Sequence, residues 1–199
     1  MIPLRPARES EVVLAFLRAE TDRWHYDARI QNLLHALGIT NQQLIDADPR
    51  NEYYNVLREG VLDAFRGYLS RTGVFTKFPK EVAWQRVELG PGELAGRLRY
   101  VRSGEWMPRS DGTRQPQRVA EKFARDELDR KTAETVAGIR KRLELGEILP
   151  EIVAVEGEGT DLILLEGAHR TTAYVSLQWP KSVPAFIGSS PAMRDWLFY

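Results

Sequence analysis

The sequence predicts an α+β protein in which an N-terminal helical region, residues 1–80, precedes a small mixed β-sheet domain with flanking helices, residues 81–199. Three observations lead to this prediction. Apolar residues recur at three- and four-residue steps in the first part of the chain, as in amphipathic helices. From Glu81 onward, short alternating or continuous apolar runs indicate strands. Gly and Pro residues separate these runs from further helical stretches.

Composition sets limits on the function. The chain has 199 residues, of which 43% are hydrophobic, and this is enough for a substantial core. It contains no cysteine, which excludes disulfides, thiolate metal sites and cysteine redox chemistry. The 28 Lys and Arg residues balance 28 Asp and Glu residues, so no overall charge attracts nucleic acid or anionic membrane. Because we find neither a signal peptide nor an apolar run of membrane-spanning length, we expect a soluble cytoplasmic protein without a membrane partner.

Helices are expected over most of residues 9–72. One apolar stripe covers residues 12–17, and a second covers residues 30–37 and ends at Gly38, as is typical of helix C-termini. A capping box is expected at Thr40 and Gln43, and a longer stripe runs from residue 54 to residue 69. The cluster Trp24-His25-Tyr26, at a break between helices, favours packing over chemistry. This region could be a lid, a homodimer surface or a docking module for a partner.

The next segments alternate between strand and loop. Residues 82–89 have the two-residue period of a strand that ends at the Gly90-Pro-Gly92 turn. Residues 103–116 form a long loop rich in Gly, Pro, Ser and Asp, in which Trp106 argues against disorder. Thr113 and Arg114 in this loop could bind an anion, and Glu105 could act as a carboxylate base. An ordered surface loop without a function is the alternative.

Further elements complete the predicted sheet domain. Residues 116–146 predict one long or broken helix, and residues 150–155 and 183–187 predict strands. A short helix is expected after the last strand, with Pro191 at its first position and Ser189 or Ser190 as its cap.

The most informative stretch is residues 161–177. Its continuous apolar run, Leu162–Leu165, predicts a buried strand, Gly167 ends the strand, and helical spacing follows. A helix that begins at the end of a buried strand presents free N–H groups and the positive end of its dipole, which attract phosphate or carboxylate. Gly167 permits close approach of a ligand, and His169 and Arg170 add hydrogen-bond donors. The alternative is a tight turn with ordinary surface side chains.

The segment Leu165-Glu-Gly-Ala-His-Arg-Thr-Thr-Ala-Tyr174 resembles the G-x-H-R signature of the ParB/sulfiredoxin-like superfamily. In that superfamily a strand, this turn and a helix form part of a nucleotide phosphate site. The resemblance implies a set of residues that contact the nucleotide: Gly167, Ala168, His169, Arg170 and Thr171. In sulfiredoxin the residue between Gly and His is the catalytic cysteine, whereas here it is Ala168, so sulfiredoxin activity is not expected.

The same resemblance implies further site residues upstream. Leu89-Gly-Pro-Gly-Glu93 is similar to the L-x-P-x-E of ParB-like free amino-acid kinases, where the glutamate is the base for the substrate hydroxyl. The alternative is that Glu93 is a favourable acidic residue in the first turn of a helix. In the sulfiredoxin-like pattern, a lysine of the helix before the Pro-led strand contacts the nucleotide, which points to Lys131 and, less directly, to Thr135 one turn away.

Several catalytic motifs are absent from the sequence. It contains no P-loop, no H-E-x-x-H, no G-x-S-x-G and no His and carboxylate cluster at metal-ligand spacing, so no metal-binding residues are predicted. ParB-type partition proteins carry a helix-turn-helix after the nucleotide domain. This chain shows none after its last strand, which argues against a ParB-like nuclease or a partner that is a nucleic acid.

The sequence therefore favours an enzyme, a nucleotide-dependent kinase or phosphotransferase that acts on a small hydroxyl-bearing metabolite. ATP or CTP would be the nucleotide, and magnesium would bridge its phosphates. His169 and Arg170 would hold the phosphates, and Glu93 or Glu105 would accept the hydroxyl proton. The alternative is a non-catalytic module that senses a nucleotide or binds a partner.

Overall fold

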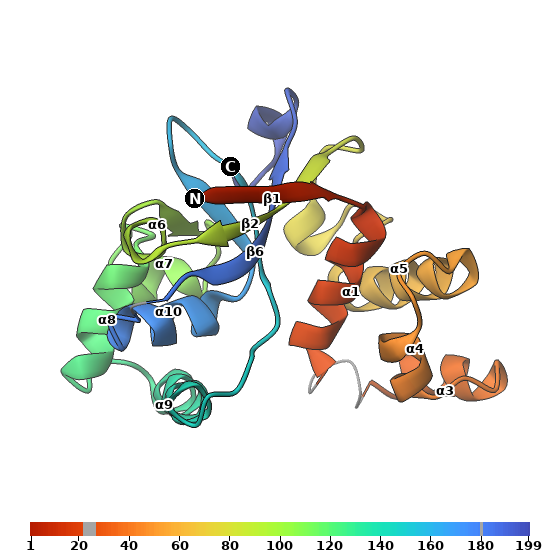
Figure 1. The fold of residues 1–199 in the computed structure, drawn as a ribbon, viewed down its shortest axis with the longest axis horizontal. Coiled ribbons are helices and arrows are strands. Elements are labelled where there is room, and N and C mark those ends of the chain that lie inside the picture. The colour runs from red at the N-terminus through yellow and green to blue at the C-terminus, as the bar shows by residue number, and fades with distance from the viewer. Residues whose placement is uncertain (22–26, 180) are drawn as a thin grey trace.

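The computed structural model describes residues 1–21, 27–179 and 181–199 and has an α+β fold (Figure 1). A six-stranded mixed sheet with the strand order β1-β2-β6-β4-β5-β3 forms its centre. The strands have these bounds: β1 (Ile2–Ala7), β2 (Ala83–Leu89), β3 (Leu98–Tyr100), β4 (Ile152–Glu156), β5 (Leu162–Glu166) and β6 (Val183–Ser189). The β6–β4 and β5–β3 pairs are parallel and the other pairs are antiparallel.

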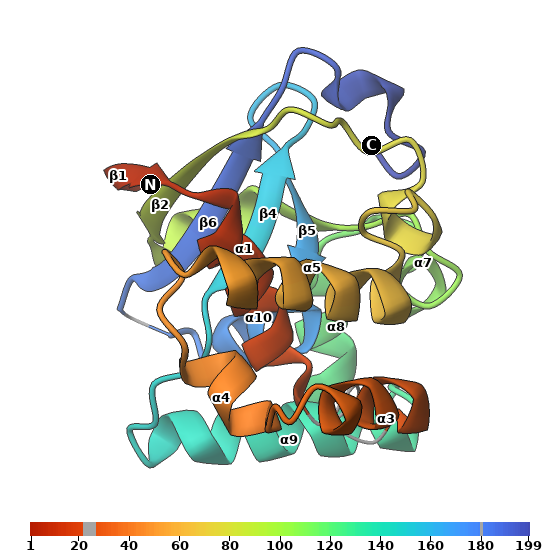
Figure 2. The same ribbon diagram turned by 90° about the vertical axis from the view of Figure 1, so that its right-hand side faces the viewer.

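Helices cover both faces of the sheet. On one side lie α1 (Glu9–Ala19), α3 (Ala28–Ala36), α4 (Asn41–Asp46) and α5 (Glu52–Arg66), as Figures 1 and 2 show. On the other side lie α8 (Pro116–Ala124), α9 (Arg130–Glu144) and α10 (Ala168–Ser176). The shorter helical segments are α6 (Pro91–Gly96), α7 (Trp106–Arg109) and the 3₁₀ turns Gly73–Phe75 and Met193–Asp195. None of the helices in the described ranges combines the length and the apolar content needed to cross a bilayer.

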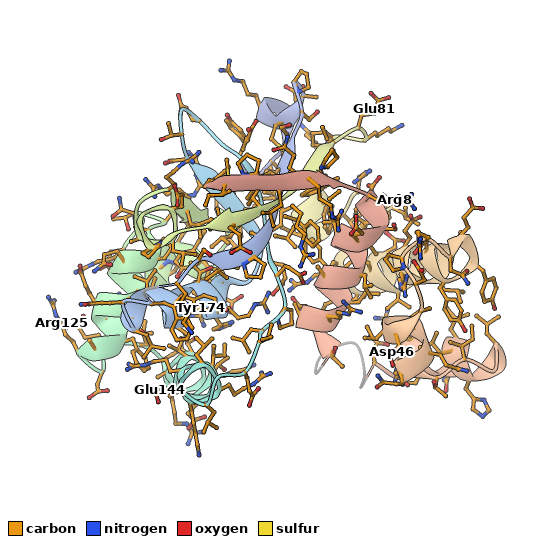
Figure 3. All side chains as sticks on the ribbon, in the orientation of Figure 1. Arg8, Asp46, Glu81, Arg125, Glu144 and Tyr174 are labelled. Atoms are coloured by element: carbon orange, nitrogen blue, oxygen red, sulfur yellow. The ribbon has the colours of Figure 1, made fainter. Side chains whose placement is uncertain are left out.

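Side chains fill the space between the sheet and the helices (Figure 3). The buried apolar ones form two clusters, one on each face of the sheet. Successive residues of a strand point to opposite faces, so β4 and β5 contribute to both clusters. Val153, Val155, Ile163 and Leu165 pack with the N-terminal helices, whereas their neighbours Ile152, Ala154, Leu162 and Leu164 pack with α8, α9 and α10. Because helices cover both faces of the sheet, the residues on both faces of β4 and β5 are apolar, and the sequence of each strand is a continuous apolar run.

The strand β1 was not expected from the sequence. Residues 2–7 lie in the region predicted to be helical, yet they pair antiparallel with β2 at the edge of the sheet. The segment contains Pro3 and Pro6 and is mostly exposed, so it shows no apolar period. An edge strand tolerates proline because one of its sides needs no ladder hydrogen bonds. The division of the chain near residue 80 stays a prediction, and the helices before it share a core with the sheet.

Several local predictions can be compared with the structure. The capping box of Thr40 and Gln43 is present, and the helical stretch 116–146 is broken into α8 and α9. The C-terminal helix is instead a 3₁₀ turn that begins at Met193, and Ser189 is the last residue of β6. The cluster Trp24-His25-Tyr26 lies outside the described residues.

Candidate functional site

The corner between β5 and α10 has the predicted form of strand, glycine turn and helix. Gly167 has a φ of 103°, in the region that favours glycine. A Cβ at this position would lie 3.2 Å from the Cγ1 atom of Ile152 and 3.2 Å from Nη2 of Arg170. The absence of a side chain therefore allows α10 to begin close to β4, with the N–H groups of its first turn at the end of the sheet.

Arg170 is buried at this corner, with 7% of its surface exposed. Its Nη2 atom donates to the backbone oxygen of Glu151 at 3.2 Å and lies 3.6 Å from Oε1 of Glu166. Its Nε atom is buried and has no hydrogen-bond partner in the described part of the chain. The guanidinium is thus fixed in place with one donor unused.

Glu166 places a carboxylate beside the start of α10. Its Oε1 atom accepts a hydrogen bond from the backbone N–H of Gly167 at 2.8 Å, and its Oε2 atom lies 3.7 Å from Nη2 of Arg66. Arg66, at the end of α5, also forms an ion pair with Glu20 of the α1 C-terminus. The negative charges of Glu20 and Glu166 therefore offset the positive charges of Arg66 and Arg170. An external anion bound here would contact the groups that now contact the Glu166 carboxylate.

An aromatic cluster supports His169 on the other side of the corner. Trp106 stacks on Tyr100 with ring centroids 4.4 Å apart and meets the His169 ring edge-on at 4.9 Å. The hydroxyl groups of Tyr100 and Thr172 are 2.6 Å apart and buried, and burial raises the pKa of Tyr100, so this phenol stays neutral. The 103–116 loop is thus ordered through Trp106, which fixes the orientation of the imidazole.

A cavity of about 900 Å³ opens over the corner. Its lining comes from the end of β5, the start of α10, the C-terminal ends of α1 and α5, and residues of α7 and α9. Basic side chains outnumber acidic ones in its lining, with Arg18, Arg66, Arg109, Lys131, Arg142 and Arg170 against Glu20, Glu105 and Glu166. This excess of positive charge suits an anionic ligand.

Most of the predicted site residues meet at this cavity. Those that line it are Glu105, Lys131, Thr135, Gly167, Ala168, His169 and Arg170. Lys131 is an exposed residue in the first turn of α9. The Glu105 carboxylate is half exposed and lies 2.8 Å from Nη1 of Arg109, whose Nε atom also pairs with Asp129 at 2.9 Å.

The other predicted site residues lie outside the cavity that the described residues form. Glu93 accepts from the backbone N–H of Gly90 at 2.9 Å and pairs with the Met1 amino group at 2.5 Å, a hydrogen bond that lowers the pKa of Glu93. Arg114 donates from Nε to the Tyr100 carbonyl at 2.7 Å, and the Thr113 hydroxyl donates to the Ser110 carbonyl at 2.7 Å. Thr171 is fully buried in α10. These contacts give Glu93 a capping role and tie the loop to β3.

Sequence reasoning missed the part of the cavity that the N-terminal helices supply. Arg18 and Arg66 are basic residues in the last turns of α1 and α5, a placement that is common because it suits the helix dipole. No local signal distinguished them from ordinary helix ends. Their role depends on the packing of these helices against the sheet.

The described residues contain no group of three or more His, Cys, Asp or Glu side chains that could hold a metal ion. A comparison of the chain with known protein families, with curated proteins and with solved structures finds no match.

Proposed function

We propose that the cavity binds a nucleoside triphosphate, ATP or CTP, and that the protein transfers a phosphoryl group from it to a small hydroxyl-bearing metabolite. The observation that carries this proposal is the buried guanidinium of Arg170, fixed beside the first turn of α10 with its Nε donor unused. A buried cation next to a helix N-terminus suits phosphate, because both groups stabilise negative charge. The G-x-H-R resemblance supports the same ligand.

The other basic side chains of the cavity suit a polyphosphate. Backbone N–H groups from Ala168 to Arg170 and the His169 ring would contact one phosphate group. Lys131, Arg109 and Arg142 line the walls and would neutralise the remaining charge. Phosphoryl transfer depends mainly on such positioning and charge neutralisation, with little covalent chemistry from the protein.

Glu105 is the better candidate for the base that accepts the hydroxyl proton. It lines the cavity, whereas Glu93 is occupied by Gly90 and the Met1 amino group. A magnesium ion would be held mainly by the phosphates and by water, because magnesium usually keeps several waters at nucleotide sites. The ion would supply further charge neutralisation when bound.

Calorimetry with ATP and with CTP, each in the presence of magnesium, tests the binding claim. Arg170→Ala is expected to weaken binding at least about 100-fold, about 2.7 kcal/mol, because it removes the fixed charge at the corner. Arg118→Ala is the matched control, since Arg118 pairs with Asp111 and Glu121 away from the cavity. A folded Arg170→Ala protein with wild-type affinity would refute the proposal.

Transfer assays over a panel of hydroxyl-bearing metabolites separate the enzyme from its alternative. Glu105→Gln is expected to lower the transfer rate by roughly 10²–10⁴-fold while nucleotide affinity stays near the wild-type value. The ion pair between Glu105 and Arg109 favours a second candidate, a nucleotide sensor, because this contact occupies the carboxylate that would accept the proton. Tight nucleotide binding without turnover of any metabolite in the panel would support the sensor.

A further inference from the structure

A second cavity of about 650 Å³ adjoins the one at the corner. Arg18, Thr21, Arg142 and Pro150 line both cavities, so the two share a wall. The remaining lining comes from the start of α4 and from Ile148 in the link between α9 and β4. This link runs on the side of α9 that faces the N-terminal helices (Figure 1).

The lining of the second cavity differs in chemistry from that of the first. Ile45, Ile148 and Pro150 are apolar, and Thr40, Asn41 and Gln42 are neutral and polar. The described residues place no carboxylate in this lining, and its only charges are the two arginines of the shared wall. A ligand part that fits here is flat and apolar on its faces and has neutral hydrogen-bonding groups at its edge.

The polar residues of this lining still have hydrogen-bonding groups that could bond the edge of a ligand. The side-chain amides of Asn41 and Gln31 bond to each other at 3.0 and 3.3 Å, which fixes the orientation of the Asn41 amide. An amide offers two donor hydrogens and a carbonyl oxygen with two lone pairs, so this pairing uses only part of its capacity. The same holds for Gln42, whose amide nitrogen donates to Asp46 at 2.7 Å.

Ile148 is the second observation that points to a ligand. Its side chain is 93% exposed, although it lies on the rim of a cavity and next to Pro150, which is partly buried. A bound ring would cover this apolar surface, and covering it would favour binding. Leu145, at the start of the same link, is 72% exposed but lines neither cavity, which makes it a matched reference.

We infer that the second cavity binds the base and ribose of the nucleotide whose phosphates lie at the corner, so that the N-terminal helices complete the nucleotide site. This inference rests on the proposed function. It assigns the phosphates to the arginine-lined cavity and the nucleoside to the amide-lined one, with Arg18 and Arg142 at their boundary.

Two ligands, ATP and inorganic tripolyphosphate, separate the two compartments in calorimetry on the full chain. Ile148→Ala and Asn41→Ala are expected to weaken ATP binding about five- to tenfold and to leave tripolyphosphate affinity within about twofold of wild type. Leu145→Ala is expected to change neither affinity. Arg170→Ala is expected to weaken both. Because Ile148 is almost fully exposed, its truncation should leave folding intact, and a melting curve checks this.

The outcomes are distinct. Unchanged ATP affinity in both Ile148→Ala and Asn41→Ala, or an equal loss for ATP and tripolyphosphate, overturns the inference and leaves the proposed function standing. Wild-type protein that binds neither ATP, CTP nor tripolyphosphate overturns the proposed function, and the inference with it. If CTP alone binds, the same variants are measured with CTP in place of ATP.

Discussion

Arg58 and Arg170 are both buried, but their surroundings differ. Arg58 is a residue of α5 that is 0% exposed. Its side chain reaches α4 and donates to the Leu44 carbonyl at 2.8 Å and to the Ala47 carbonyl, and it also donates to the Asn55 side chain at 2.9 Å. Burial lowers the pKa of Arg58. Arg170 makes one hydrogen bond to a backbone carbonyl, keeps an unused Nε donor and lines the larger cavity.

This difference separates a structural charge from a charge suited to a ligand. At Arg58 the guanidinium links two helices, and its carbonyl partners would be left unpaired without it. At Arg170 the guanidinium makes fewer hydrogen bonds and lines a cavity, although burying a charge is costly. Four changes to the protein or to its solution conditions test this difference.

Arg58→Leu should have the largest effect on stability. The free energy of unfolding is expected to fall by about 3 kcal/mol, because buried acceptors at Leu44 and Ala47 lose their donor. Denaturant unfolding measures the loss. Arg50→Leu is the control, since that side chain is 74% exposed and pairs with Asp48 in the same region, so its loss should stay below about 1 kcal/mol. Equal losses in the two variants would show that Arg58 has no special structural role.

Gly167→Ala should have the next largest effect. A φ of 103° and contacts of 3.2 Å with Ile152 and Arg170 predict a loss of roughly 1–3 kcal/mol in unfolding free energy and weaker phosphate binding. Gly138→Ala in α9, where no atom lies within 4 Å of the new Cβ, should instead stabilise the protein by roughly 0.5–1 kcal/mol. Thermal unfolding compares the two. A neutral Gly167→Ala variant would contradict the close packing at the corner.

Glu166→Gln tests whether an internal carboxylate competes with the ligand. The variant keeps an acceptor for the Gly167 N–H and removes the negative charge between Arg66 and Arg170. Tripolyphosphate affinity is therefore expected to rise about tenfold, or about 1.4 kcal/mol. Glu156→Gln, at the far end of β4, makes the same change in net charge and should have little effect. Weaker binding would instead make Glu166 a residue that orients Arg170.

The smallest effect concerns Asp129, an exposed partner of Arg109. Hydrogen bonds from the Thr132 backbone and hydroxyl, and then from Arg109, lower the pKa of Asp129 from 3.8 to about 2. Since the folded pKa is the lower one, the stabilisation is fully present above about pH 4 and is lost as the pH falls toward 2. The difference in melting temperature between wild type and Asp129→Asn should shrink over that range. A constant difference from pH 7 to pH 2 would contradict this assignment.

Local sequence patterns predicted the elements that determine their own structure. The run from Leu162 to Leu165, followed by Gly167 and helical spacing, is strand β5, its turn and α10. Likewise, Thr40 and Gln43 form the expected capping box, since both partners lie within four residues. These predictions depend only on near neighbours in the chain.

The parts that were missed depend on distant contacts. β1 is a strand only because β2, some eighty residues later, offers its edge. Glu93 has a motif-like position, but the Met1 amino group that it pairs with becomes visible only in the fold. The contribution of Arg18 and Arg66 to the larger cavity likewise follows from helix packing, which no single-sequence pattern encodes.

The place of β6 in the sheet has a consequence for biosynthesis. In the described sheet, the last strand to be synthesised, β6, lies between β2 and β4 and joins the β1–β2 pair to the β4–β5–β3 group. Until residues 183–189 have left the ribosome, the β1–β2 pair and the β4–β5–β3 group cannot be joined. β2 and β4 would then each have an edge with unpaired backbone N–H and C=O groups. Such edges are prone to pair with other chains, so premature termination before this strand should yield aggregates rather than a folded fragment.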